Sequence, residues 1–321
     1  MSSRALRRTR SRRPSASLAA AAAERALPAA LQRHLPLPSR GEPRLLAALR
    51  QCVAHPGKMI RGRLVLAAAL AHGLARARAL ELATAVEYFH TASLLLDDLP
   101  CMDDAVQRRN QLCVHRVHGE ATAILAALAL INRAYALVAS AFARETRAAR
   151  QRAATALDRA LGAAGLVGGQ AWDLAFASTE RPASLVSRIA AGKTGALLTL
   201  ALELPAAIAR PSRIERRALA ALAVYWGQLY QIADDLSDVL DSAAATGKTT
   251  GRDRLLSRPN LALALGRERA QARWMRLARQ AQRALQTLRD RGGRRWDYLW
   301  AAHASLIRRA APEADHQHRA A

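Results

Sequence analysis

Two aspartate clusters lie 137 positions apart in a chain with few acidic residues. They are Asp97-Asp98-Leu-Pro-Cys-Met-Asp103-Asp104 and Asp234-Asp235-Leu-Ser-Asp238, and eight of the 25 acidic residues lie between 97 and 104 or between 234 and 241. Carboxylates this close repel one another unless a cation lies between them, and hard oxygen ligands suit Mg²⁺ bridging a phosphorylated substrate. The pattern therefore predicts a site that holds a diphosphate through metal ions.

The lysines favour the same chemistry. Only three of the 49 basic residues are Lys, and each follows a glycine: Lys58 in Gly57-Lys-Met-Ile-Arg61, Lys193 in Gly-Lys-Thr194-Gly and Lys248 in Gly-Lys-Thr-Thr-Gly. A compact ammonium group on a flexible stem can reach a phosphate oxygen. The alternative is that three lysines fell beside glycines by chance, which is less probable for all three than for one.

The first aspartate cluster follows a predicted helix. Residues 79 to 98 contain no Gly or Pro and repeat apolar residues at helical spacing. His90 and Asp97, seven apart, share a face of this helix, so His90 is a candidate ligand-binding residue as well as a candidate core histidine. Pro100 ends the helix, and the bend should bring Asp103 back toward Asp97.

Three further segments should position charged side chains. A helix from Lys58 to Leu70 would place Lys58 and Arg61 on one face, beside free amides that favour an anion. Arg108-Arg109 follow the first cluster and suit either phosphate oxygens or a local salt bridge. In a helix over 214–241, Gln231, Asp234, Asp235 and Asp238 form one stripe, which we expect to face a cavity.

Composition predicts an all-α protein with one large core. Ala, Leu and Arg dominate the 321 residues, and aromatic residues make up only 4%. This composition favours helix nearly throughout. Further helices are expected over 121–141, 160–176 and 183–204, and over 261 to about 310 with a break at Gly292-Gly293. Two domains are the alternative that length alone suggests.

The net charge of +24 would attract polyanions, but the arginines are spread along the chain and no motif for base readout is present. We therefore expect no nucleic-acid partner. Three cysteines, Cys52, Cys101 and Cys113, favour a reducing compartment, and a zinc site would need a second cysteine pair. We expect no apolar run of the roughly 18 to 20 residues that a membrane span needs, because Asn132-Arg133 and Glu203-Leu-Pro205 interrupt the longest candidates. We expect no stable membrane insertion and a cytoplasmic protein.

The ends of the chain differ from its middle. Residues 1–25 are basic and rich in Ser and Ala, which is typical of a disordered tail or of an organellar targeting segment. We expect a single catalytic domain over 26–311 and a second disordered tail over 312–321.

These motifs together resemble the trans-isoprenyl diphosphate synthases, also called polyprenyl synthetases. The resemblance covers about 55 to 255 and rests on motifs that occur in the family's order: Gly-Lys-x-x-Arg at 57–61, His90, Asp-Asp-x4-Asp at 97–103, Arg108-Arg109, Gly-Gly-Gln at 168–170, Lys193-Thr194, Gln-x-x-Asp-Asp-x-x-Asp at 231–238 and Gly-Lys at 247–248. It implies a single helical bundle around a deep central cavity, and a homodimer.

The resemblance also implies a role for each residue. The catalytic residues would be Asp97, Asp98, Asp103, Asp234, Asp235, Asp238 and Lys193. Of these, Asp97, Asp98, Asp103, Asp234 and Asp238 would hold about three Mg²⁺ ions. Arg108, Lys193, Thr194, Gln231 and Lys248 would bind the allylic diphosphate. Gly57, Lys58, Arg61, His90 and Arg109 would bind isopentenyl diphosphate.

Product length in this family depends on residues four and five positions before the first aspartate, here Ser93 and Ala92. Neither is aromatic, and the pattern is most similar to that of bacterial geranylgeranyl diphosphate synthases, so we expect a C20 product, with farnesyl or longer products as alternatives. Two departures put the local loops in doubt. Gly62 replaces a usual Pro, and Asn110-Gln111-Leu112 replaces a usual Gly-basic-Pro.

Rival functions remain. A class I terpene cyclase also ionises a prenyl diphosphate with Mg²⁺, but it needs no isopentenyl site such as Lys58, Arg61 and His90 would form. A non-catalytic synthase subunit typically loses aspartate motifs, and this chain keeps both.

Overall fold

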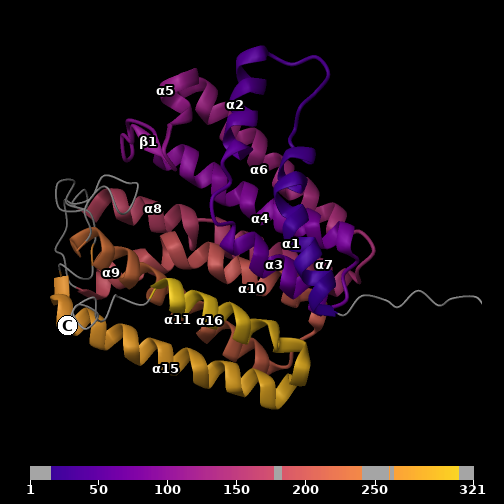
Figure 1. The fold of residues 1–321 in the computed structure, drawn as a ribbon, viewed down its shortest axis with the longest axis vertical. Coiled ribbons are helices and arrows are strands. Elements are labelled where there is room, and N and C mark those ends of the chain that lie inside the picture. Colours follow the sequence, from indigo (N-terminus) through magenta and orange to yellow (C-terminus); the bar gives the residue numbers. More distant parts are fainter. Residues whose placement is uncertain (1–15, 177–182, 241–259, 261–263, 311–321) are drawn as a thin grey trace, which may run out of the picture.

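The computed structural model describes residues 16–176, 183–240, 260 and 264–310. They form a helical bundle with a single two-stranded hairpin (Figure 1). The elements of the N-terminal half are α1 (Ala16–Arg33), α2 (Pro43–Ala54), α3 (Ile60–Ala71), α4 (Arg76–Asp97), β1 (Gln107–Arg108), β2 (Gln111–Leu112), α5 (Val114–His118), α6 (Glu120–Phe142) and α7 (Arg147–Leu161). Those of the C-terminal half are α8 (Leu166–Ala175), α9 (Ala183–Ala190), the π-helix η2 (Ala191–Gly195), α10 (Ala196–Ala209), α11 (Arg213–Leu240), α15 (Arg267–Gly292), the 3₁₀ helix η3 (Gly293–Trp296) and α16 (Tyr298–Ala310). The all-α prediction is confirmed.

Helix α4 is at the centre of the bundle. It packs against α1, α3, α6 and α10, and buried residues occur on all of its faces. A helix with buried residues on every side must be enclosed by other helices, so α4 is more deeply buried than a helix with a single apolar stripe would be. In Figure 1 the N-terminal helices occupy the upper part of the molecule, α8 and α10 cross its middle, and α15 lies along the lower edge against α11. Asp97 is therefore at the end of a helix that four other helices hold in place.

The N-terminal boundary lies earlier in the chain than we expected. Helix α1 begins at Ala16, and Ala23 is fully buried with Leu27 against the core. Residues 16–25 were assigned to a tail because of their charge and small side chains. Alanine has a high helix propensity and buries easily, so this part of the segment forms a packed helix.

Two helices expected from the sequence are interrupted. The expected helix over 160–176 is divided between α7 and α8 by residues 162–165, where a side chain on Gly162 or Gly165 would collide with the carbonyls of α7. The expected helix over 183–204 contains η2 between α9 and α10. A π-helical turn inside an α-helical segment is often found at a functional site, and this one carries Lys193.

The hairpin β1–β2 was not predicted. Arg108 pairs with Gln111, so Arg109 and Asn110 form a two-residue turn, with φ of 55° and 60°. Turns of this kind need two residues in the left-handed region, which Asn tolerates well. The departure at Asn110-Gln111-Leu112 thus has a structural explanation, because these residues build the hairpin that carries both arginines.

Helix α6 is the one helix among the described residues that is long and apolar enough to span a membrane by length and composition. The expected interruption at Asn132-Arg133 is wrong, because these residues lie within α6 and a single arginine leaves most of the helix apolar. Arg133 Nε donates to the carbonyl of His34, and α6 packs against α4 and α2. Core helices of bundles pass the same test, so this helix alone is weak support for a membrane span.

Candidate active site

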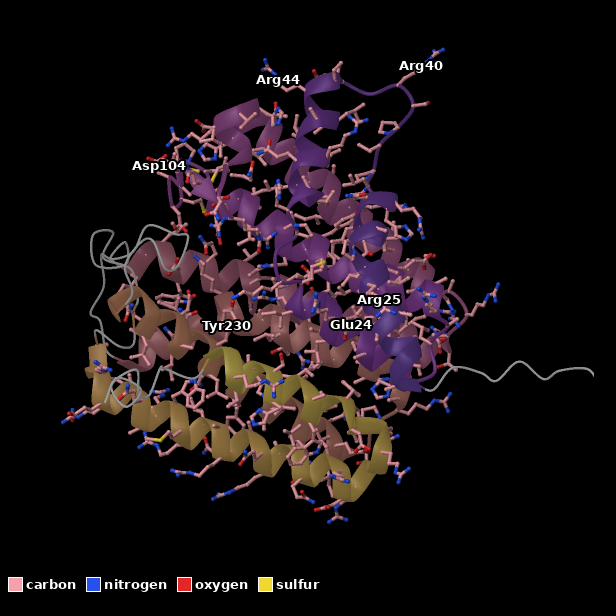
Figure 2. The ribbon with its side chains drawn as sticks, in the orientation of Figure 1. Glu24, Arg25, Arg40, Arg44, Asp104 and Tyr230 are labelled. Carbon is pink, nitrogen blue, oxygen red and sulfur yellow. The ribbon has the colours of Figure 1, made fainter. Side chains whose placement is uncertain are left out.

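The loop after α4 brings the first aspartate cluster together. The amide of Asp103 donates to the carbonyl of Asp97 at 2.9 Å, and the amide of Ala105 donates to the carbonyl of Asp98 at 3.1 Å. These bonds fold the loop back over the end of α4. The predicted return of Asp103 toward Asp97 is therefore confirmed. Asp104 has a φ of 44° and lies at the surface, where it pairs with Arg116 at 2.6 Å (Figure 2).

Lys193 lies among the carboxylates of this loop. Its Nζ is 2.8 Å from Asp173 Oδ2 and 3.8 Å from Asp97 Oδ2. Burial lowers the pKa of Lys193, but Asp97, Asp173 and Asp103 together raise it, so the ammonium group stays charged. Burial also raises the pKa of Asp97 to about 6, with the Asp103 carboxylate adding to the rise and Lys193 opposing it. The site holds more acid than its lysine neutralises, and it would bind a further cation.

Asp173 is a residue that our sequence reasoning missed. It is buried on α8, and the sequence showed it only as the end of Gly168-Gly169-Gln170-Ala-Trp-Asp173. Its spacing from the Gly-Gly-Gln motif could have identified it, since Asp173 is four residues after Gly169 and three after Gln170 and so shares their side of a helix. Gln170 itself donates from Nε2 to the sulfur of Met102 at 3.5 Å, in the aspartate loop.

Glycines explain how η2 is held between two helices. A Cβ on Gly169 would lie 2.4 Å from the backbone N of Lys193, and one on Gly192 would lie 2.8 Å from Gly169 Cα. On the other side, a Cβ on Gly227 of α11 would lie 2.9 Å from Gly195 Cα. Such backbone contact is open only to glycine. The two Gly-rich motifs therefore meet each other, and their contact positions Lys193.

Asp98 is paired with Arg108. Its carboxylate is buried and bonded to Arg108, with Nε at 2.7 Å from Oδ1 and Nη2 at 2.6 Å from the same oxygen. Burial lowers the pKa of Arg108, but the bond to Asp98 raises it. Our sequence analysis weighed phosphate against a salt bridge for Arg108, and the salt bridge is present in this structure. A role of Asp98 as a metal ligand stays a prediction.

A second, basic group lies around the turn of the hairpin. Arg109 is in that turn and not on a strand, and it donates from Nη1 to the carbonyl of His55 at 2.9 Å, whereas Arg108 binds Asp98. Gly57 has a φ of 67°, and a Cβ on it would lie 2.8 Å from Arg109 Nε. Arg61 Nη1 lies 3.3 Å from His90 Nε2. The structure thus brings together four of the five residues expected to bind isopentenyl diphosphate.

His90 adds no charge to this basic group. Burial lowers the pKa of His90 well below its ordinary value, and Arg61, Arg109 and Arg108 lower it further. The imidazole is therefore neutral. Lys58, the fifth residue, is exposed in the turn before α3 and is not part of the helix, which begins at Ile60 and not at Lys58 as expected.

The second aspartate motif lies on α11. Asp235 is buried and accepts a bond from Gln231 Nε2 at 2.7 Å, while Asp234 is exposed. The expected stripe therefore runs along a boundary between core and solvent. The side chains of Thr194 and Asp238, and the whole of Lys248, lie outside the described residues.

The described acidic, histidine and cysteine side chains form no group of three that could hold a metal ion by themselves. Several of their carboxylates have other partners, since Asp98 binds Arg108 and Asp173 binds Lys193. Asp97 and Asp103 nevertheless fit Mg²⁺, because the loop brings these two oxygen ligands together beside Asp173, with Lys193 as the cation that contacts Asp97 and Asp173. Magnesium usually takes one or two carboxylates and completes its shell with water and substrate phosphates, so a full protein cage is not required.

The two residues expected to control product length differ in their surroundings. Ala92 is fully buried, whereas Ser93 is partly exposed and donates from Oγ to the carbonyl of His90 at 2.9 Å. Ser93 also lies four residues before Asp97 and so shares its side of α4. Of the two, Ser93 is the one with open space beside it.

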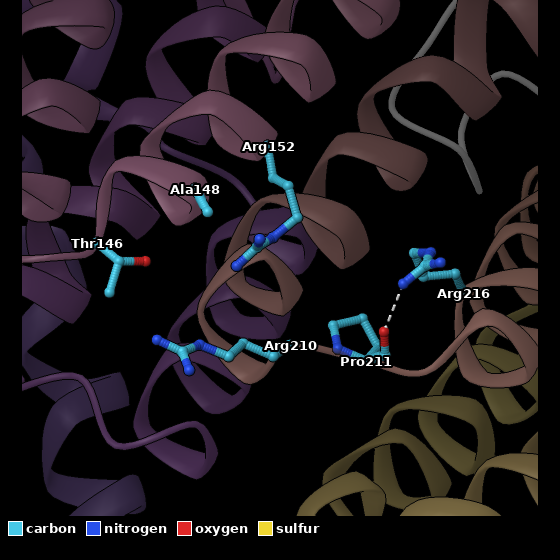
Figure 3. A pocket seen from close by; sticks show the side chains of 6 residues that line it. All are labelled: Thr146, Ala148, Arg152, Arg210, Pro211 and Arg216. Atoms are coloured by element: carbon cyan, nitrogen blue, oxygen red, sulfur yellow. Dashed lines mark hydrogen bonds between the residues drawn. The ribbon is translucent and has the colours of Figure 1, made fainter.

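A cavity of about 420 Å³ lies elsewhere, between the start of α7 and the turn that joins α10 to α11 (Figure 3). It contains none of the predicted site residues. Arg152 donates to the carbonyl of Ala207 and Arg216 donates to that of Pro211, so these two arginines bind backbone carbonyls at and just beyond the end of α10. Lys193 lies at the opposite end of α10, roughly 20 Å away along the 14-residue helix.

Comparison with known proteins agrees with this site. The family model for polyprenyl synthetase matches residues 42–290. The chain is 39% identical over 220 residues to a geranylgeranyl diphosphate synthase of Pantoea ananas, covering 68% of this chain and 72% of that protein. It is 34% identical over 286 residues to a probable farnesyl diphosphate synthase of Bradyrhizobium diazoefficiens, covering 88% and 85%.

A solved structure is similar over nearly the whole chain. It is a geranyltransferase of Helicobacter pylori complexed with magnesium and isoprenyl diphosphate, with a TM-score of 0.81 and 26% identity, covering 93% of this chain and 100% of that one. These matches agree with the order of the motifs and with the carboxylate and basic groups found around the hairpin. The chain therefore belongs to the polyprenyl synthetase family of prenyltransferases.

Proposed function

We propose that this protein condenses isopentenyl diphosphate with an allylic diphosphate and releases geranylgeranyl diphosphate. The observation that carries the proposal is the division of Arg108 and Arg109 between two groups. Arg108 lies with the carboxylates around Asp97, and Arg109 lies with Arg61 and His90. Two diphosphates of different roles need two such binding sites beside each other, one with metal-binding carboxylates and one in which arginines predominate.

The carboxylate group would bind the allylic substrate. Asp97 and Asp103, with Asp234 from α11, would hold Mg²⁺, which neutralises the diphosphate as the allylic C–O bond breaks. Lys193 supplies a fixed positive charge at the same place, and its bond to Asp173 keeps it oriented before substrate arrives. About three ions per site is the number we propose from the family resemblance.

The basic group would bind isopentenyl diphosphate without metal. Arg61 and Arg109 are permanently charged donors, and the neutral His90 fits a donor or acceptor role that adds no charge. The isopentenyl double bond would attack the allylic cation, and the leaving diphosphate would accept the proton that is lost. A side-chain base is then unnecessary.

The C20 product is supported by Ser93, Ala92 and the similarity to the Pantoea ananas enzyme. Both side chains are small and lie about 6 to 7 Å below Asp97 along α4, so neither blocks a chain that grows past this depth. The similarity to a probable farnesyl diphosphate synthase keeps C15 as the second candidate product.

We also propose that the protein forms a homodimer through α6. The helix exposes Ile124, Leu125, Leu128 and Tyr135, with Leu125 and Leu128 more than half exposed. These positions recur at three, four and seven residues and form one apolar stripe, which we call the α6 stripe. A two-fold axis would place the same stripe of a second copy against it, which is how symmetric dimers cover such surfaces.

The experiment that tests the reaction is incubation of purified protein with isopentenyl diphosphate and farnesyl diphosphate, with and without Mg²⁺, followed by dephosphorylation and analysis of the alcohols. We expect a Mg²⁺-dependent C20 alcohol that is absent with Asp97→Ala. A hydrocarbon product would favour a terpene cyclase. No consumption of isopentenyl diphosphate with any allylic primer would contradict the proposal and favour a non-catalytic subunit.

A further inference from the structure

The N-terminus of α3 is capped by a residue from another helix. Its N-cap, Met59, is in the left-handed region with φ of 46° and makes no side-chain cap. The first-turn amides of a helix lack partners within the helix. One of them, the amide of Gly62, donates to Glu87 Oε1 of α4 at 2.6 Å. A carboxylate at this end also interacts favourably with the helix dipole.

Glu87 is a buried acid within the basic group. Burial raises its pKa, while the Gly62 amide and the charges of Arg61, Arg109 and Arg63 lower it. A buried carboxylate is costly unless it is hydrogen-bonded and balanced by charge. Glu87 has both, and its location ties the backbone of α3 to the arginines of the site.

Gly62 is required for this contact. A Cβ at this position would lie 2.7 Å from Glu87 Cγ, 3.1 Å from Glu87 Oε1 and 3.1 Å from Leu27 Cδ2. Proline would in addition remove the N–H that Glu87 accepts. The glycine that departs from the expected Pro therefore creates a pairing that this chain would otherwise lack.

Helix α4 holds the first turn of α3 at two points. Glu87 binds the backbone at Gly62, and His90, three residues later on the same side of α4, contacts the side chain of Arg61. The two contacts together determine where the Arg61 guanidinium lies. We propose that Glu87 is a positioning residue, which through Gly62 orients Arg61 and the first turn of α3 for the diphosphate of isopentenyl diphosphate; this rests on the proposed function.

Whether removal of the Glu87 carboxylate weakens or tightens diphosphate binding distinguishes a positioning role from a purely electrostatic one. A carboxylate repels an anionic ligand, so its removal would tighten diphosphate binding if charge alone mattered. If Glu87 acts by holding α3, its removal must weaken binding. A glutamine keeps an oxygen that accepts from the Gly62 amide, and it should preserve the position of Arg61.

The test compares Glu87→Ala, Glu87→Gln and Gly62→Ala with the wild type by calorimetric binding of isopentenyl diphosphate alone, and by KM for each substrate. We expect Glu87→Ala and Gly62→Ala to weaken isopentenyl diphosphate binding by about tenfold, the loss that follows from one misplaced charged hydrogen bond. Glu87→Gln should stay within about threefold of wild type, and KM for the allylic diphosphate should change less than about twofold in all three.

Glu81→Ala serves as the control, because it removes a glutamate from the same helix whose charge acts on His34 and not on the arginines of the basic group. Thermal unfolding reports whether each variant folds. If Glu87→Ala does not fold, the inference is tested with Gly62→Ala. Equal or tighter binding by folded Glu87→Ala, or an equal rise of both KM values, would overturn the inference. A different result would contradict the proposed function: a wild type that binds isopentenyl diphosphate but never consumes it.

Discussion

The ammonium group of Lys193 lies 2.8 Å from the Asp173 carboxylate, which links the π-helix η2 to α8 at the point where Gly169 and Gly192 touch. Lys193 is thus oriented by a buried acid that is not part of either aspartate motif. Its second carboxylate neighbour, Asp97, is 3.8 Å away. The lysine can therefore turn toward a diphosphate without losing its anchor.

Asp173→Asn should lower kcat by about tenfold, because a charged hydrogen bond that orients Lys193 is worth roughly 1.5 to 3 kcal/mol and each 1.36 kcal/mol is tenfold in rate. Steady-state kinetics at saturating substrates measures the change. Asp158→Asn, at an exposed position on α7, is the matched control. A kcat within twofold of wild type would mean that Asp173 serves packing alone.

Asp98→Asn should raise KM for the allylic diphosphate while leaving the Mg²⁺ concentration for half-maximal activity unchanged. The reason is that both Asp98 oxygens already bind Arg108. Asp103→Asn, by contrast, should raise the Mg²⁺ requirement. A Mg²⁺ titration of both variants distinguishes the roles, and a raised Mg²⁺ requirement for Asp98→Asn would support the metal-ligand role expected from the sequence.

Ser93→Phe should shorten the product from C20 to C15, since Ser93 is partly exposed on the Asp97 side of α4. Ala92→Phe places the same ring in a fully buried position and should instead cost about 1 to 3 kcal/mol of stability through overpacking. Chromatography of the dephosphorylated products and urea unfolding measure the two effects. Unchanged product length in Ser93→Phe would place the floor of the cavity elsewhere.

Leu128→Glu should convert the proposed dimer to monomer, because it puts a charge in the middle of the α6 stripe. Met275→Glu is the matched control, since Met275 is 53% exposed and Leu128 is 55% exposed, and Met275 lies on α15. Light scattering after size-exclusion chromatography gives the mass of each. A wild-type monomer, or a dimer that survives Leu128→Glu, would contradict the proposed interface.

His72 should make the protein less stable in mild acid. Burial lowers its pKa from 6.5 to about 4, with Arg295 contributing, and its ring packs against Trp296 and Tyr298. The unfolded chain therefore takes up the proton first, so this stability is complete above pH 6.5 and is lost as pH falls toward 4. Urea unfolding across this range should show a weaker pH dependence for His72→Phe, and an unchanged dependence would exclude His72 as the cause.

Local sequence determined most of the helices and the identity of the charged residues. Alanine, leucine and arginine favour helix at nearly every position, so the predicted spans for α4, α6 and α11 differ from the observed ones by a few residues at most. The return of Asp103 followed from Pro100, because the proline effect acts within one turn of chain.

Features that depend on contacts between distant segments were not predictable in this way. The split of Arg108 from Arg109 needs the hairpin, and a two-residue turn with Arg at a left-handed position has a weak sequence signal. The pairing of Asp98 with Arg108 likewise could not be separated from a metal-binding role by spacing, since both need the same residue types.

The all-α class, the two carboxylate motifs, the three glycine-flanked lysines and the chemistry that these residue types permit can all be derived from the amino-acid sequence. The pairing of each carboxylate with its cation, the bond of Asp173 to Lys193 and the capping of α3 by Glu87 at Gly62 depend on the folded structure. The physical reason is that helix propensity and residue chemistry are local properties, whereas hydrogen-bond partners are chosen when helices far apart in the chain come into contact.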